Sequence, residues 1–190
     1  MRAWLIFLVI ATVAAAGPVE VFEVSKERLS ELPGGKEADG IIGDFVIRNE
    51  HVEAVISGNL PLRRANMGTY YGKGKETPGC LYDLTLRGED NDQLTLFSPG
   101  KQWGRLTSMG GWVSEKHGEG KCFSVQDGIR SPDGIGRRHV YRLGPGDRVL
   151  RIESTYTNES AEPLVVDLAD DVRGFRTKGS FLGTDWFEAV

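Results

Sequence analysis

The stretch IIGDFVIRNEHVEAVI, residues 41–56, contains the clearest structural signal in the chain. Apolar and polar residues alternate on both sides of Asn49-Glu50, which predicts two antiparallel strands joined by a two-residue turn. Pairing across this turn places Ile47 opposite Val52, so one face of the hairpin is apolar. The residues of the other face, which we expect to contact water, are Asp44, Arg48, His51 and Glu53.

Working outward, the same alternation predicts further strands between short polar turns. In the next hairpin, residues 81–98, we expect Tyr82, Leu84 and Leu86 to face the same way as Leu94 and Leu96. A third antiparallel set is predicted by RHVYRL (138–143), RVLRIESTYTN (148–158) and PLVVDLAD (163–170).

The pattern of the whole chain indicates an all-β fold. Glycine makes up 25 of 190 residues, well above the usual share of about 7%, and the glycines lie between apolar runs. Only residues 25–32 have the composition of a helical turn or two. Many short strands joined by short turns predict an antiparallel β-sandwich, with long loops at 59–79 and 99–120 that are candidates for function.

The N-terminus has the layout of a secretory signal peptide. Arg2 precedes an apolar run from Ala3 to Ala16, and Gly17-Pro18 follows it. Cleavage between Ala16 and Gly17 is expected, and a retained membrane anchor is the alternative, although a spanning helix needs about 20 apolar residues. We therefore expect a secreted or periplasmic protein, with residues 1–16 as signal peptide, 17–37 as a strand with a short helical or linker segment, and 38–190 as the β-sandwich.

Charge and cysteine content limit the partners and the covalent links. Without the signal peptide the chain has 22 basic and 27 acidic residues, so nothing in its charge favours nucleic-acid binding, and no later apolar run is long enough for a membrane span. Cys80 and Cys122 could form a disulfide in an oxidising compartment. Two buried free thiols are the alternative, and the sequence leaves both open.

Several enzyme classes find no support in the motifs. The three histidines lie far apart, and HExxH, CxxC and the G-x-S-x-G elbow are absent, so paired-histidine zinc sites and a nucleophile-elbow hydrolase are disfavoured. We expect His51 and His139 to be solvated. Asp90, Asp92 and Asp170 could supply oxygen ligands to calcium, but they lack a calcium-loop spacing and fit solvated or capping roles as well. No other cofactor is predicted.

Aromatic and acidic residues offer two sugar-related hypotheses. Asp171 with Asp185 or Glu188, beside Trp186, could form an acid/base pair with a stacking platform, although Trp186 could equally belong to the core of a last strand. Trp103, Trp112 and Trp186 could present flat faces to a carbohydrate, or fill the end of a sandwich.

Three phrases resemble a known kind of domain: DGIIGDFVIRNEHVEAVI (39–56), GTYYGKGKETPGCLYDLTL (68–86) and VLRIESTYTNESAEPLVVDLADDVRGF (149–175). They resemble the N-terminal galactose-mutarotase-like, supersandwich-type module of large exported bacterial proteins, over residues 38–190. The resemblance implies a sandwich that precedes other modules, and an incomplete C-terminal end here. The histidine motifs of the hydrolases attached to such modules are absent.

The sequence thus leaves three functional hypotheses. The first is an exported non-catalytic module that binds carbohydrate or a partner protein. The second is a sugar-acting enzyme that uses the clustered carboxylates, and the third is a structural scaffold domain of a larger secreted protein.

Overall fold

The computed structural model describes residues 17–35, 38–65, 76–92, 94–101, 106, 108–113, 120–126, 133–174, 180–181 and 184–185. The expected signal peptide, residues 1–16, lies outside this set. None of the helices among the described residues is long and apolar enough to cross a membrane.

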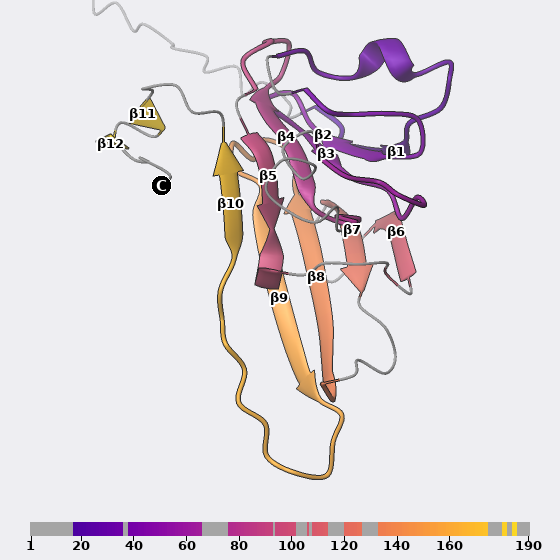
Figure 1. The fold of residues 1–190 in the computed structure, drawn as a ribbon. Helices are drawn as coiled ribbons and strands as arrows, with labels where there is room; N and C mark the ends of the chain where they lie inside the picture. The colour runs from indigo at the N-terminus through magenta and orange to yellow at the C-terminus, as the bar shows by residue number, and fades with distance from the viewer. Residues whose placement is uncertain are drawn as a thin grey trace, which may run out of the picture.

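The described chain is all-β, which confirms the predicted fold class, and its two main antiparallel sheets are consistent with a β-sandwich (Figure 1). Within the described residues, one sheet has the strand order β1-β2-β3-β4-β5-β10 and the other the order β6-β7-β8-β9. A small hairpin, β11–β12, follows. The first sheet comprises β1 (Glu20–Glu23), β2 (Phe45–Arg48), β3 (Val52–Ile56), β4 (Leu81–Leu86), β5 (Leu94–Ser98) and β10 (Asp171–Gly174). The remaining elements are β6 (Ser108–Val113), β7 (Lys121–Gln126), β8 (Ile135–Leu143), β9 (Arg151–Asn158), β11 (Ser180–Phe181), β12 (Thr184–Asp185) and the 3₁₀ turns η1 (Leu29–Glu31) and η2 (Pro99–Lys101).

The main core lies between the inner faces of the two sheets. Apolar residues of β2 and β3 pack against residues of β7 and β8 in one cluster, and the rings of Phe45 and Phe123 lie 4.6 Å apart. A polar contact also joins the sheets, because the buried Tyr141 hydroxyl donates to the carbonyl of Gly79 at 2.8 Å. Desolvation of these apolar faces is the main contribution to stability.

The hairpin of residues 41–56 forms with a different register from the predicted one. Ile47 pairs with Ala54 and Arg48 with Glu53, a shift of two residues. Because side chains alternate with period two, this shift keeps every side chain on its expected face, and the apolar face does lie in the main core. The error arose at the turn: Asn49 Oδ1 accepts the backbone N–H groups of His51 and Val52, which makes Glu50-His51 the turn.

The second face of this hairpin is buried, contrary to the expectation that it contacts water. Asp44, Arg48 and Glu53 are 0%, 7% and 3% exposed, because η1 and the chain that leads into β2 cover this face. Val24, Val46 and Val55 form a second small core there.

Arg48 holds this covering segment to the sheet. Its guanidinium lies 2.6 Å from a carboxylate oxygen of Glu20 on β1, 2.6 Å from one of Glu31 on η1 and 3.2 Å from one of Glu53 on β3. Hydrogen bonds from Arg28 and Arg48 lower the pKa of Glu31 to about 2. The buried cation is thus matched by carboxylates from three parts of the chain, as a charge removed from water requires.

The expected common face of the second hairpin does not form. Val55 pairs with Asp83 and Ile56 with Leu81, so Tyr82 is an extra residue in a β-bulge. The bulge places Tyr82 with Leu96 in a separate cluster. The two leucines that pack against the main core instead are Leu84 and Leu94, and Leu86 is 55% exposed.

Two further expectations about strands are wrong. Residues 163–170 have no strand structure: they leave β9 and cross to the first sheet, where β10 pairs with β5 (Figure 1). The region 99–120, expected to be a loop, contains β6.

His139 is also not solvated, because β8 begins at Ile135 and the imidazole lies inside, 1% exposed, with Nδ1 2.9 Å from Ser154 Oγ.

Gly79 allows the two sheets to approach each other. Its φ is +75°, and a Cβ atom there would lie 2.5 Å from Val125 Cγ1 on β7 and 2.7 Å from Leu106 Cδ1. We predict that Gly79→Ala lowers the free energy of unfolding by about 2–5 kcal/mol, from backbone strain plus overpacking. Urea denaturation measures this change.

Gly88→Ala is the matched control for this substitution. Gly88 has a similar φ of +80° with no atom within 4 Å of the added Cβ, so only the strain of about 1–2 kcal/mol remains. Equal losses of stability in the two variants would contradict the assigned close approach of the sheets.

Candidate functional site

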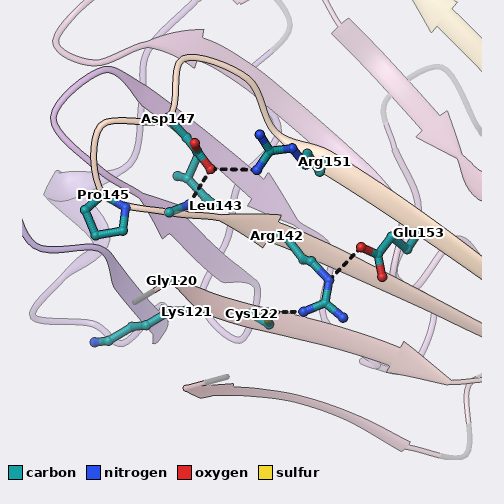
Figure 2. Close-up of a pocket in the computed structure, with 10 residues that line it drawn as sticks. Gly120, Lys121, Cys122, Arg142, Leu143, Pro145, Asp147, Arg151 and Glu153 are labelled. Atoms are coloured by element: carbon teal, nitrogen blue, oxygen red, sulfur yellow. Dashed lines mark hydrogen bonds and ion pairs between the residues drawn. The ribbon is translucent and has the colours of Figure 1, made fainter. Parts of the chain in front are cut away.

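A pocket of about 300 Å³ lies at one end of the second sheet, where β7, β8 and β9 meet the turn after β8 (Figure 2). Its volume is at the lower end of the range for small-molecule sites. The residues that line it are Gly120, Lys121, Cys122, Arg142, Leu143, Gly144, Pro145, Asp147, Arg151 and Glu153.

Strand register aligns the charged residues of the pocket. Cys122 on β7 pairs with Arg142 on β8, which pairs with Arg151 on β9. Residues directly opposite one another in a sheet project from the same face, so the side chains of Cys122, Arg142 and Arg151 extend from one face of the sheet. Trp112 on β6 is opposite Cys122 and so occupies the next register position of the same row.

The turn that closes the pocket is held by side-chain hydrogen bonds. The Gly144 N–H donates to Asp147 Oδ2 at 2.8 Å, and Gly146 has a φ of +75°. Asn49 Nδ2, from the β2–β3 turn, donates to the carbonyls of Gly144 and Asp147, each at 2.8 Å. One side chain therefore orders the turns of both sheets and fixes the wall of the pocket.

Among the described residues, the charged side chains of the pocket are two ion pairs and one lysine without an ion pair. Figure 2 shows Arg142 directed at Glu153, with Nε and Oε1 2.9 Å apart, and Arg151 directed at Asp147 at 3.2 Å. Arg142 also donates to Cys122 Sγ at 3.0 Å. Lys121 has no ion pair with any described residue. Guanidinium, ammonium and carboxylate groups in one open pocket can donate to and accept from a polyhydroxylated ligand.

The residues of the predicted sugar site are only partly described. Trp103, Trp186 and Glu188 lie outside the described residues, and for Trp112 and Asp185 the structure gives the backbone position alone. Asp171 lies on β10, and both of its carboxylate oxygens accept hydrogen bonds from Arg173, the shortest at 2.7 Å. The proposed pairing of Asp171 with Asp185 or Glu188 stays a prediction.

The candidate calcium ligands each bind a different stretch of backbone. Asp90 accepts from the Gly34 N–H at 3.1 Å, and Asp170 from the Gly100 N–H at 2.8 Å. Asp92 accepts from the N–H of Leu84 at 2.9 Å. No group of three or more His, Cys, Asp or Glu residues suited to a metal ion occurs among the residues that the structure describes.

A cluster of buried carboxyl groups was not predicted from the sequence. Asp39, Asp44, Asp83 and Asp92 are each 8% exposed or less, and they lie where β4 meets the chain that leads into β2. The guanidinium of Arg63 neutralises Asp44, with Nη2 2.6 Å from Oδ2 and Nε 3.1 Å from Oδ1. Alternation assigned Asp44 to the polar face of its hairpin, and nothing in the pattern indicated that this face is covered.

No family model, no curated protein and no solved structure matches this chain.

The two cysteines are free, buried thiols in different environments. Cys80 packs with Ala65, Tyr82 and Leu96, where burial raises the pKa of its thiol to about 12. Cys122 lies on β7, beside Arg142.

We predict that Ellman's reagent detects two thiols per chain in unreduced, denatured protein. In the native protein Cys80 should not react at pH 8, because thiolate is the reactive form and burial keeps this thiol protonated and shielded. Protein reduced before denaturation is the control. If no thiol is detected without reductant, the cysteines form a disulfide and the structure is wrong on this point.

Proposed function

We propose that this chain is an exported, non-catalytic β-sandwich module that binds carbohydrate, with the pocket of β7–β9 as its binding site. The observation that supports it most directly is the pocket itself, in which Lys121, Arg142, Arg151, Asp147 and Glu153 surround an open space of about 300 Å³. Sugar hydroxyl groups both donate and accept hydrogen bonds, so a mixed lining of cations and carboxylates suits them better than a lining of one sign.

The position of the pocket fits this role. It lies on paired strands, so little conformational entropy is lost when a ligand binds. The row through Cys122, Arg142 and Arg151 continues on β6 at Trp112. Tryptophan is a residue type that stacks on sugar rings, and at this register position it extends the proposed site.

The proposal includes a galactose-mutarotase-like type of sandwich and a secreted or periplasmic location. Two antiparallel sheets are compatible with the galactose-mutarotase-like type that the three sequence phrases resemble. The apolar run from Ala3 to Ala16 supports export to a secreted or periplasmic location. A module of this type would present its pocket to glycans outside the cytoplasm.

A glycan array with the chain from Gly17 onward tests the proposal, followed by calorimetry with the best ligand. We expect Lys121→Gln to weaken binding about 10- to 100-fold, as for the loss of one hydrogen bond from a charged donor. Because Lys121 has no ion pair among the described residues, the substitution leaves no carboxylate of this part of the chain unpaired.

Lys26→Gln is the matched control, with the same change of charge at an exposed turn near the N-terminus. This variant should bind as the parent does. Absence of binding to any glycan, or equal binding by the parent and Lys121→Gln, would contradict the assignment of the pocket.

A further inference from the structure

Asp83 on β4 is a carboxyl group without contact with water. Its exposure is 0%. Oδ1 accepts the backbone N–H of Asp39 at 3.1 Å, whereas Oδ2 is buried and has no hydrogen-bond partner among the residues that the structure describes. A buried carboxylate oxygen with no partner is costly, while the neutral acid is far less so.

The charges around Asp83 also disfavour its ionisation. Asp39 and Asp44, from the chain that leads into β2, and Asp92, from the chain before β5, are the carboxyl groups that act on it. The nearby cation, Arg63, follows β3 and is bound to both oxygens of Asp44, while it stacks on the Tyr82 ring at 4.3 Å. Its charge is therefore paired with that of Asp44, and among the described residues the cluster has more carboxyl groups than cations.

Asp83 is also one of the points where the covering segment contacts the sheet. Besides the bond from Asp39 N–H, a Cβ atom on Gly40 would lie 3.5 Å from Asp83 Oδ2, so the backbone of this stretch lies directly on the carboxyl group. The Asp39 carbonyl accepts from Arg63 Nη2 at 2.5 Å. Any charge that develops on Asp83 thus develops beneath the Asp39-Gly40 backbone.

We propose that Asp83 binds a proton in the folded chain at neutral pH and acts as a pH-sensitive clasp, which holds the Asp39-Gly40 stretch on the sheet and loosens it when the proton leaves. Burial, with repulsion from Asp92, Asp39 and Asp44, raises the pKa of Asp83 to about 8 and outweighs the hydrogen bond from the Asp39 N–H, which lowers the pKa. This places the loss of the proton in mildly alkaline solution.

The sign of the effect on stability follows from linkage. In the unfolded chain Asp83 has its ordinary pKa of 3.8, so between about pH 4 and pH 8 the folded state holds one proton that the unfolded state has lost. The contribution of Asp83 is complete below pH 4 and is lost as the pH rises through 8. In this window the unfolding equilibrium constant increases about tenfold per pH unit because of this one group.

The test compares the unfolding equilibrium of the full chain and Asp83→Asn by urea denaturation from pH 5 to pH 9. Asparagine keeps an acceptor for the Asp39 N–H and has no proton to lose. We expect the ratio of the two unfolding constants, parent over variant, to rise about tenfold per pH unit up to pH 8 and then to level off. Amide exchange at Asp39 and Gly40 should become faster above pH 8 in the parent only, after correction for the intrinsic rate.

Asp90→Asn is the matched control, because Asp90 is exposed and accepts from Gly34 of the same covering segment. It should keep the pH dependence of the parent. A constant ratio between parent and Asp83→Asn would overturn the proposal. If Asp83→Asn does not fold, carbon-13 NMR of the parent's aspartate carboxyl groups decides: a buried carboxyl that titrates near pH 8 supports the clasp, and titration of every aspartate below pH 5 overturns it.

Discussion

The burial of Arg48 is the constraint on which the arrangement of the first sheet depends. Its side chain is 8% exposed, and its guanidinium contacts Glu20, Glu31 and Glu53. A charge removed from water is costly unless such partners are present, so β2 can bury this residue only if β1 and η1 are in place. The ion pairs therefore specify where the N-terminal segment lies, and that segment closes the small core around Val46.

The same covering segment is the reason why the aspartates beneath it are buried. Once the chain that leads into β2 lies across β4, Asp83 is cut off from water and Asp44 must be neutralised by Arg63. On the other side of the sheet, the main core brings the turn of β2–β3 next to the turn after β8. Asn49 uses this proximity to hold the wall of the pocket. Both sites are therefore consequences of how the sheets and their cover assemble.

The candidate pocket could not be found in the sequence, for a physical reason. Cys122, Arg142 and Arg151 are neighbours only because three strands pair in register, and residues far apart in the chain have no local pattern that links them. The residues chosen from the sequence were selected by type, such as tryptophans and clustered acids. Of the acids, Asp90, Asp92 and Asp170 each bind backbone N–H groups at separate places, a role that their presence in turns already allowed.

The sequence by itself determined the all-β class, most of the strands and the face on which the side chains of β2 and β3 lie, because period-two alternation is a local property of extended chain. Tertiary structure decided the register, which depends on the turn that Asn49 caps, and the bulge at Tyr82. It also decided that the charged face of that hairpin is covered. Alternation distinguishes two faces of a strand, but what packs on each of them depends on other segments of the chain, such as η1.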